Sequence, residues 1–451
     1  MALRIVLVRH GLSSFNVEHR IQGRDDLSEL TAEGERQALA AGEALADVPF
    51  SGVYSSPLRR AADTARLMLQ THGQGLEASL DDDLMEIDLA PWSGLLRREL
   101  RERFPEQEQR WREAPQELVL ERADGSSYRP LPELMVQADR FCRRLIERHG
   151  AALGEDGPGG DPASVLVVAH NAILRCLVLS LLGLEASGFR RLRIDNGSIS
   201  VLNLRAGERQ RPDVQLESLN SSAHLGDPLP PKGACPRLLL VRHGETDWNR
   251  QGRFQGQIDI PLNANGHAQA EAAGAFLASV AIQRAYTSAM ARPRQTAEAI
   301  LASHPGVPLT STTGLVEIGH GLWEGRLEGE IAEGWSQLLA DWKRAPETVQ
   351  MPQGETIHDV WQRSLSTWQR IAASLSADET ALVVAHDAVN KTILCALLGL
   401  TPADIWMIKQ GNGGVTVVDY PNGPAGTPVV AAMNLTAHLG GVLDRTAAGA
   451  L

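Results

Sequence analysis

The sequence predicts an α/β protein that contains two copies of one domain, each with a mostly parallel sheet flanked by helices. Short apolar runs rich in β-branched residues, such as RIVLV at 4–8 and SVLVV at 164–168, indicate buried strands. They alternate with helical patterns such as 31–47 and 265–280. Strands that alternate with helices favour a parallel sheet covered on both faces. The second observation behind the prediction is that one ordered set of motifs occurs twice.

Seven segments of the first half recur in the same order in the second half. A single match would mean little, but an ordered series indicates a duplicated domain. We therefore expect domains at 1–227 and 237–451, joined by a Pro- and Gly-rich linker at 228–236. The matched pairs are IVLVRHG and LLLVRHG, RIQG and RFQG, YSSPLRRAADTA and YTSAMARPRQTA, MEIDLAPWSG and VEIGHGLWEG, VLVVAHNA and ALVVAHDA, DNGSISVL and GNGGVTVV, and AHLG twice.

The composition limits the classes of partner. The chain has 451 residues, of which 43% are apolar, which is enough for two buried cores. Its formal net charge of −12 argues against nucleic acid and against an anionic membrane surface, because both require a basic face. A small anionic substrate stays compatible, since a local group of arginines can reverse the field inside one cleft.

The cysteines and the apolar segments favour a cytoplasmic protein. The four cysteines are scattered without a CxxC pair, so neither a zinc site nor a disulfide framework is indicated. The apolar start runs directly into Arg9 and His10, and we expect no secretory signal. The apolar stretches at 172–184 and 391–400 are too short or too interrupted to span a bilayer, and they predict buried helices.

Charged and polar residues stand where the predicted strands of the second copy end. Arg242 and His243 follow one apolar run directly, and His386 follows another. Arg292 lies at the start of a helix that follows a third strand, and Glu317 lies in a glycine-rich loop. In a parallel sheet the site lies beyond the carboxyl ends of the strands. We therefore expect two histidines, two arginines and one glutamate to converge there.

This set of side chains suits phosphoryl transfer. Two guanidinium groups in one place require an anion with several oxygens, and their forked shape matches phosphate. Imidazole can attack phosphorus and form a covalent intermediate, while the second histidine and the arginines offset charge in the transition state. A glutamic acid with a raised pKa can protonate the leaving alkoxide and later deprotonate water. We expect no metal and no cofactor.

Four segments of the second copy, VRHGETDWN, TSAMARPRQTA, VEIGHGLWEG and VVAHDA, resemble the histidine phosphatase superfamily, also called phosphoglycerate mutase-like. The resemblance covers nearly all of both copies. The tandem layout is similar to the two-domain 2-carboxy-D-arabinitol-1-phosphatase group of that family. The resemblance implies a metal-independent phosphatase that forms a phosphohistidine and acts on sugar or sugar-acid phosphates.

The resemblance also implies a role for each matched residue. His243 is the phosphorylated nucleophile, Glu317 is the proton donor, and Arg242, Arg292 and His386 bind the phosphoryl group. Asn249 and Gly256 belong to the substrate-binding set. The matched residues of the first copy are His10, Glu86, Arg9, Arg60, His170, Asn16 and Gly23.

The first copy departs modestly from the family pattern. Leu12 replaces the acidic or amide residue expected after RHG, and Asp63 replaces the glutamine of RQTA. Neither position belongs to the chemical set, so we expect an intact site. The charged run at 97–113 predicts one solvated helix, which could form part of a lid over the first site.

The spacing favours hydrolysis over mutase activity. A mutase of this family has a long insertion between the glutamate and the second histidine, whereas only 69 positions separate Glu317 from His386 here, and 84 separate Glu86 from His170. A small cap leaves the phosphohistidine open to water. A cofactor-dependent phosphoglycerate mutase, and a phosphosugar-binding regulatory protein with one inactive domain, stay as alternatives. The sequence leaves the oligomeric state open, although two joined copies could form a monomeric pseudo-dimer.

Overall fold

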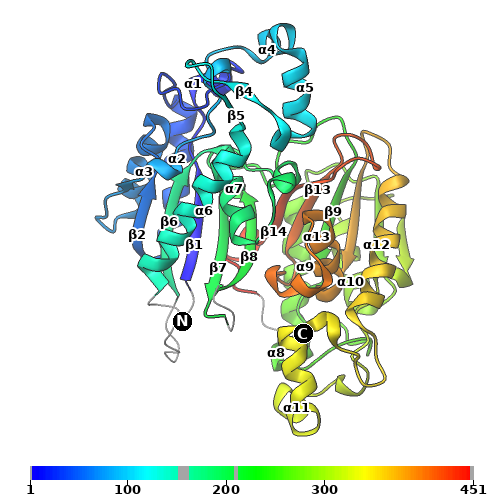
Figure 1. Ribbon diagram of the computed structural model, residues 1–451. Helices are drawn as coiled ribbons and strands as arrows, with labels where there is room; N and C mark the ends of the chain where they lie inside the picture. The colour runs from blue at the N-terminus through cyan, green and yellow to red at the C-terminus, as the bar shows by residue number, and fades with distance from the viewer. Residues whose placement is uncertain (1–2, 151–161, 208–211, 447–451) are drawn as a thin grey trace. The chain divides into compact units, whose positions relative to one another are not determined.

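The computed structural model describes residues 3–150, 162–207 and 212–446 (Figure 1). The chain divides into two compact units, Met1–Asp227 and Pro228–Leu451. Each unit contains one copy of the sequence repeat and its own run of parallel strands.

The first unit is built on strands in the order β8-β7-β1-β6-β2-β3. The strands from β1 to β3 in this order are parallel, whereas β7 and β8 run antiparallel to their neighbours. A separate short hairpin pairs β4 with β5. The strands are β1 (Leu3–Arg9), β2 (Phe50–Ser55), β3 (Ser79–Leu80), β4 (Leu120–Glu121), β5 (Ser127–Tyr128), β6 (Ala163–Ala169), β7 (Ile199–Arg205) and β8 (Asp213–Ser221).

The second unit repeats this order as β14-β13-β9-β12-β10-β11. Again β9, β12, β10 and β11 are parallel, and β13 and β14 are antiparallel. The predicted fold class, a mostly parallel sheet in each copy, is therefore confirmed. The strands are β9 (Arg237–Arg242), β10 (Arg284–Ser288), β11 (Leu309–Thr312), β12 (Thr380–Ala385), β13 (Val415–Asp419) and β14 (Val429–Leu435).

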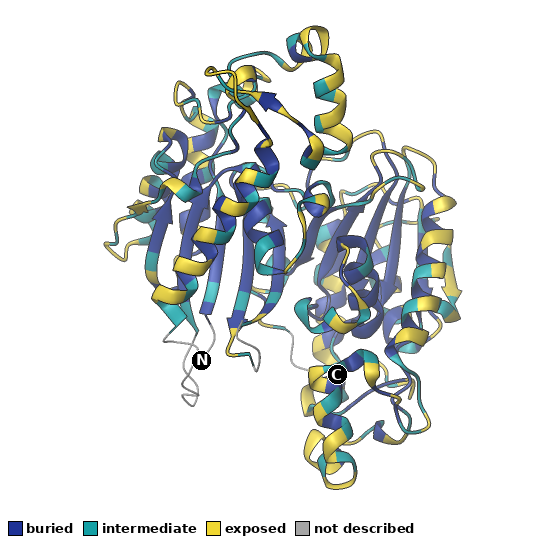
Figure 2. Cartoon of the chain, viewed as in Figure 1, coloured by how far each residue is buried: buried dark blue, intermediate teal, exposed yellow. Residues whose placement is uncertain are grey.

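Helices flank each sheet, and the central strands are buried along most of their length (Figure 2). The helices of the first unit are α1 (Ser14–Val17), α2 (Ala32–Ala44), α3 (Arg59–His72), α4 (Arg97–Arg103), α5 (Pro105–Glu113), α6 (Pro130–His149) and α7 (Asn171–Leu181). Those of the second are α8 (Asp247–Gln251), α9 (Ala264–Leu277), α10 (Ala291–Leu301), α11 (Glu328–Arg344), α12 (Ile357–Ala373) and α13 (Asp387–Leu398).

The two apolar segments predicted to be buried helices form α7 and α13. Each begins directly after a histidine that ends a central strand, and most of its residues are buried. Within the described ranges, no helix is long and apolar enough to cross a membrane.

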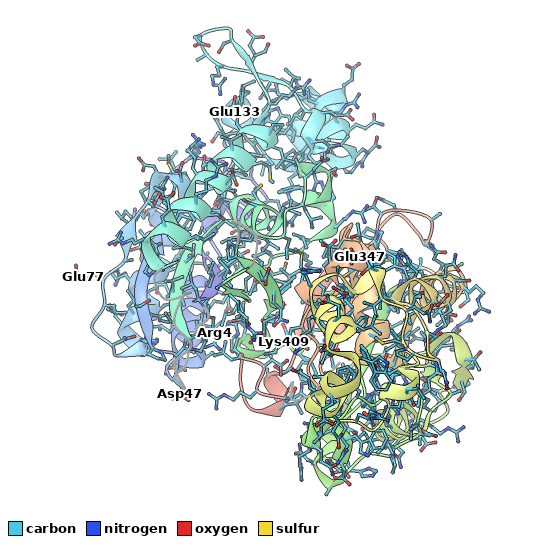
Figure 3. All side chains as sticks on the ribbon, turned by 60° about the horizontal axis from the view of Figure 1, so that its bottom comes forward. Arg4, Asp47, Glu77, Glu133, Glu347 and Lys409 are labelled. Carbon is cyan, nitrogen blue, oxygen red and sulfur yellow. The ribbon has the colours of Figure 1, made fainter. Side chains whose placement is uncertain are left out.

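A small cap stands beyond the carboxyl ends of the parallel strands in the first unit, built from α4, α5 and the β4–β5 hairpin (Figure 1). Arg122 of the hairpin segment pairs with Glu133 of α6 at 2.7 Å, which links the hairpin to the body of the unit. Figure 3 labels Glu133 among the side chains of this unit. In the second unit α11 occupies the matching place in the sequence.

The charged run at 97–113 forms two helices, so the prediction of one helix is wrong. Phe104, between α4 and α5, has a non-helical φ of −135° and ψ of 53°. The residue before a proline is disfavoured in the helical region, and Pro105 follows it. However, the matching Trp335 inside α11 has nearly the same angles, φ −141° and ψ 43°, although serine follows it. The packing of the cap therefore contributes to this bend in both units.

The segment at 228–236 packs on the second unit. Leu229 belongs to the apolar core of that unit. The guanidinium group of Arg237 donates to the Pro230 carbonyl at 2.9 Å and pairs with the buried Asp419 at 2.7 Å. These contacts fix the entry of the chain into β9.

A close approach of two glycines in each unit holds the loop after the first strand against the next long helix. A Cβ atom on Gly266, in the first turn of α9, would lie 2.0 Å from the carbonyl oxygen of Glu245. A Cβ atom on Gly244 would lie 2.3 Å from the Gly266 carbonyl oxygen. The first unit repeats the contact: a Cβ atom on Gly11 would lie 2.2 Å from the Gly34 carbonyl oxygen, and one on Gly34 would lie 2.2 Å from the Leu12 carbonyl oxygen.

We expect Gly266→Ala to destabilise the second unit by about 1–3 kcal/mol, because the new methyl group meets backbone that cannot move away cheaply. Gly329→Ala is the matched control. It also lies in the first turn of a helix, but a Cβ atom there meets nothing within 4 Å. Without a clash, Gly→Ala in a helix should be neutral or stabilise by up to about 1 kcal/mol. Urea unfolding of both variants measures the difference, and equal effects would contradict this account of the contact.

Candidate active site

Neighbouring parallel strands bring the two histidines of each unit together. His243 follows β9 and His386 follows β12, and the His243 N–H donates to the Ala385 carbonyl at 3.0 Å. The two ring centroids are 5.1 Å apart, and the rings of His10 and His170 in the first unit are 5.1 Å apart as well. All four histidines are buried.

The first histidine of each pair is held as a neutral ring with one defined free nitrogen. His243 Nδ1 lies 2.7 Å from the carbonyl oxygen of Gly244, which can only accept, so Nδ1 carries the proton. The lone pair is then on Nε2, and the Arg292 Nε–H donates to it at 3.2 Å. Burial, Arg292 and Arg242 hold the pKa of His243 well below its usual value. His10 has the same Nδ1 contact, at 2.7 Å.

The second histidine is oriented by a serine at the end of a third strand. His386 Nε2 lies 2.8 Å from Ser288 Oγ, and His170 Nε2 lies 2.8 Å from Ser56 Oγ. The serine hydroxyl can donate to Nε2, which leaves the ring proton on Nδ1. That Nδ1 atom is buried and has no hydrogen-bond partner among the described residues in either unit. It is therefore available to an oxygen of a bound ligand.

Backbone carbonyls anchor the arginine that begins the helix after the third strand. Arg292 is fully buried, and its Nη2 donates to the Gly256 carbonyl at 2.8 Å and its Nη1 to the Ile258 carbonyl at 3.3 Å. Arg60 donates from Nη2 to the Gly23 carbonyl at 2.9 Å. Burial lowers the pKa of Arg292 to about 10, which still leaves it charged at neutral pH.

The arginine that ends the first strand is held in a similar way. Arg242 Nη1 donates to the Gln410 carbonyl at 2.6 Å, and Arg9 Nη1 to the Ile194 carbonyl at 2.9 Å. Arg242 Nη1 also lies 3.4 Å from a carboxylate oxygen of Asp387. Burial lowers the pKa of Arg9 to about 10. The Nε atoms of both arginines are buried and lack a partner among the described residues.

Glu317 is a buried carboxyl group on the same rim. Its Oε1 accepts from its neighbour, the Ile318 N–H, at 2.9 Å, and Oε2 accepts from the Ala388 N–H in the first turn of α13 at 3.4 Å. Burial and then the nearby Asp387 raise its pKa. The raised pKa favours the protonated form, which can donate its proton to a leaving group.

Glu86 occupies the matching place in the first unit with a different set of contacts. Its Oε1 accepts from the N–H groups of Ile87, Ala172 and Ile173 at 2.9, 3.1 and 3.2 Å. The residue that begins α7 is Asn171, where α13 begins with an aspartate. Glu86 is half-buried.

The asparagine and glycine of the predicted substrate-binding set shape the loops around the site. Asn249 Oδ1 accepts from the Thr246 N–H at 3.1 Å, and Asn16 Oδ1 accepts from the Ser13 N–H at 3.2 Å. These bonds occupy the side-chain oxygen. The side-chain amide nitrogen of Asn249 is then the group that can donate to a ligand. Gly256 has φ +54°, and its carbonyl is the acceptor for the buried arginine, so its contribution is through the backbone.

Two pairs of residues that support the nucleophile were outside the predicted set. Thr296 Oγ1 accepts from the Gly244 N–H at 3.1 Å, and Asn412 Nδ2 donates to the His243 carbonyl at 3.0 Å. Both fix the turn that carries the imidazole. In the first unit the same contacts are made by Thr64 and Asn196. Both pairs could have been found in the sequence, because they lie in segments that the two copies share.

The departures of the first copy leave the backbone of its site unchanged. The Leu12 N–H donates to Gln37 Oε1 at 2.9 Å, and the matching Glu245 N–H donates to Gln269 Oε1 at 2.8 Å. Asp63 is half-buried on α3, 3.7 Å from the Arg59 guanidinium. In the described part of the chain, no three His, Cys, Asp or Glu side chains form a group that could hold a metal ion.

The chain is similar to known proteins in sequence and in structure. The family model of the histidine phosphatase superfamily (branch 1) matches residues 5–215 and 238–435. A 2-carboxy-D-arabinitol-1-phosphatase from Triticum aestivum is 30% identical over 97% of this chain and 87% of its own length. A probable phosphoglycerate mutase from Citrobacter koseri is 34% identical over 50% of this chain and 96% of its own. The native structure of a mycobacterial glucosyl-3-phosphoglycerate phosphatase is 28% identical, with a TM-score of 0.43, over 49% of this chain and all (100%) of its own.

The family model spans most of both sequence copies, and the first of these relatives aligns with nearly the whole chain. The family predicted from the four sequence segments is therefore confirmed. The chain belongs to the histidine phosphatase superfamily, branch 1, and is an enzyme of the phosphatase class.

Proposed function

We propose that both units hydrolyse small phosphorylated metabolites, such as sugar or sugar-acid phosphates, through a phosphohistidine. In the second unit His243 is the nucleophile, Glu317 is the proton donor, and three side chains bind the phosphoryl oxygens. Those three are Arg242, Arg292 and His386, and Asn249 with the Gly256 loop completes the set. The first unit uses His10, Glu86, Arg9, Arg60, His170, Asn16 and the Gly23 loop.

The observation that carries this proposal is the state of the His243 ring. The Nδ1–H donates to the Gly244 carbonyl, so the lone pair of the ring is on Nε2. This lone pair accepts a hydrogen bond from the Arg292 Nε–H. When a phosphate binds, the same guanidinium N–H can donate to a phosphate oxygen instead, which leaves the lone pair free to attack phosphorus. The low pKa of the ring keeps it neutral and nucleophilic at physiological pH.

In the first half-reaction the Nε2 lone pair forms a bond to phosphorus, and the bond between phosphorus and the ester oxygen breaks. The leaving oxygen takes the proton of the Glu317 carboxyl group. Two guanidinium groups and the free Nδ1–H of His386 face the equatorial oxygens, where negative charge is largest. They are already in place before substrate binds, so little reorganisation is needed.

In the second half-reaction the Glu317 carboxylate takes a proton from water. The water oxygen forms a bond to phosphorus, the bond between nitrogen and phosphorus breaks, and its electron pair returns to Nε2. Inorganic phosphate leaves, and the carboxyl group is again protonated. Hydrolysis is favoured over transfer back to the product because the cap between the glutamate and the second histidine is small.

We further propose that 1–227 and 237–451 are the two catalytic domains and that the chain acts in the cytoplasm. The cytoplasmic proposal is supported by the cysteines, all four of which are buried and free. The expected partner is a small phosphorylated metabolite, with no nucleic acid and no membrane.

We expect the double variant His10→Ala, His243→Ala to lose at least about a thousandfold in kcat on p-nitrophenyl phosphate, because no nucleophile is left. Each single variant should keep the activity of the other unit. His267→Ala, on the exposed side of α9, is the control and should behave as the parent protein. A double variant with parental activity would refute the phosphohistidine route, and a single variant with parental activity would show that its unit is inactive.

We expect Glu317→Gln, made in the His10→Ala background, to lower kcat by about 10²- to 10⁴-fold on an alkyl phosphate, because a poor leaving group needs the proton. The loss should be much smaller on p-nitrophenyl phosphate, whose phenolate leaves without protonation. Steady-state kinetics on both esters, with His267→Ala in the same background as control, measures the difference. Equal losses on the two esters would contradict the role of proton donor.

We expect Asp387→Asn, in the same background, to move the alkaline limb of the pH profile of kcat/KM to lower pH. The acid form of Glu317 is the active form, so the rate falls as the pH rises through its pKa. Asp387 is one cause that raises this pKa, and removing its charge lowers it. Asp378→Asn, at an exposed position, is the matched control. A limb that stays in place would show that another group sets it.

A further inference from the structure

The two units carry the same phosphate-binding groups but different charges beside them. At four matched positions the first unit has Arg97, Asn171, Arg175 and Arg190, where the second has Glu328, Asp387, Lys391 and Trp406. The first unit therefore has three cations at these positions and no anion, whereas the second has one cation and two anions. We call Arg97, Arg175 and Arg190 the arginine cluster.

Among the residues that the structure describes, Arg175 is a cation without an ionic partner. It lies on α7, one turn after Asn171, and its guanidinium group stands 5.0 Å from the centroid of the Phe189 ring. It has no salt bridge or hydrogen bond within the described ranges, and its Nε atom is buried without a partner. Burial, and then the charges of Arg190 and Arg9, lower its pKa to about 9. It is therefore charged and close enough to the site arginine to feel its field.

Arg190 is held by a backbone carbonyl, which does not neutralise its positive charge. Its Nη2 donates to the Trp111 carbonyl, and its guanidinium group lies 4.9 Å from the Trp111 ring centroid. Its Nε atom is also buried without a partner in the described part of the chain. The acid whose charge it feels most, Glu108, is 3.5 Å from Arg101 and is shared with it.

The matching side chains of the second unit leave no spare cation. Lys391 pairs with Asp387 at 2.7 Å, and Glu328 pairs with Lys343 at 2.5 Å. Trp406 Nε1 donates to the carbonyl of Trp342 at 3.1 Å. Trp342 matches Trp111, so tryptophan and arginine donate to the same backbone position in the two units.

Two partly buried guanidinium groups without a carboxylate partner raise the free energy of the unliganded protein, and a bound anion lowers it. The phosphate itself has its own pair, Arg9 and Arg60. A second anion bound by Arg175 lies beside that phosphate. In the second unit Lys391 and Arg242, the matches of Arg175 and Arg9, contact the two oxygens of the Asp387 carboxylate at 2.7 and 3.4 Å. Asn171 replaces that carboxylate in the first unit, so an anion of the ligand can take its place. The two anions then belong most simply to one ligand.

We propose that the first unit selects phosphomonoesters that carry a second anionic group, which Arg175 and Arg190 bind, and that the second unit does not require one. This inference rests on the proposed function of the first unit as a phosphatase. The second group is a carboxylate or another phosphate, since the guanidinium fork fits both. Arg97, which is exposed at the start of α4, adds a positive charge that acts on Arg190.

The test compares 3-phosphoglycerate with glycerol 3-phosphate, which differ by a carboxylate in place of a hydroxymethyl group. In the His243→Ala protein, which retains only the first site, kcat/KM should be about 10- to 100-fold higher for 3-phosphoglycerate. In the His10→Ala protein this preference should be absent. A bisphosphate, measured beside 3-phosphoglycerate, shows which of the two anionic groups the cluster prefers.

Arg190→Trp in the His243→Ala background copies the second unit and keeps a donor for the Trp111 carbonyl. KM for 3-phosphoglycerate should rise about 10- to 100-fold with little change in kcat, because the contact is equal in the ground and transition states. The change for glycerol 3-phosphate should stay within about threefold. Arg175→Met, which keeps the apolar stem, is the second variant, and Arg98→Trp, exposed on α4, is the matched control.

Equal losses on both esters, or no preference in the His243→Ala protein, would overturn the inference. If the His243→Ala protein hydrolyses no ester, including p-nitrophenyl phosphate, the proposed function of the first unit fails instead. Calorimetric binding of the same two esters, with and without Arg190→Trp, then decides the inference separately. Tighter binding of 3-phosphoglycerate that Arg190→Trp abolishes supports it, and indifference to that substitution refutes it.

Discussion

Guanidinium groups anchored by backbone carbonyls, beside a neutral imidazole, are the arrangement on which the rest of each site depends. A carbonyl satisfies the hydrogen bonds of an arginine without cancelling its charge, whereas a carboxylate would cancel it. Arg292 is held by the Gly256 carbonyl, so it keeps its positive charge for an incoming phosphate. Arg242 is held by the Gln410 carbonyl, and Asp387 offsets only part of its charge because that carboxylate also pairs with Lys391. The same charges, together with burial, keep His243 unprotonated. One set of anchors thus prepares both the binding site and the nucleophile.

The sheet topology makes this arrangement possible. Three neighbouring parallel strands, β9, β12 and β10, end at the same edge, and each delivers one part of the site in the residues that follow it. The anchoring carbonyls come from loops that the sheet does not position, and Gly256 needs a positive φ of 54° to present its own. The loop after β9 is in turn held by the contact between Gly244 and Gly266. The loops must therefore place their carbonyl groups within hydrogen-bond distance of the arginines that the strand ends and the following helix position.

The sequence could predict the strands, the duplication and the residues at the strand ends, because apolar runs that end in charged motifs are local signals. It could not predict the bend at Trp335, since no proline follows it and the angles depend on the packing of the cap. The sequence also could not predict that Glu317 and Glu86 have different hydrogen-bond partners and different burial. The motif around the two is alike, but their neighbours at the helix start, Asp387 and Asn171, come from a distant segment. Contacts between distant segments decide the chemistry of a carboxyl group, and a motif does not contain them.

A duplicated chain allows one copy to serve as the reference for the other. The groups that would contact phosphorus are unchanged between the units, so differences outside them act on the rest of the substrate. The exchange of Trp406 for Arg190 is structurally mild, because either side chain donates to the carbonyl of a matched tryptophan and packs against its ring. It nevertheless changes the local charge by one unit. A position where the hydrogen bond is kept and the charge is altered can change substrate selection with little cost in stability, which is how two sites with the same chemistry can diverge within one chain.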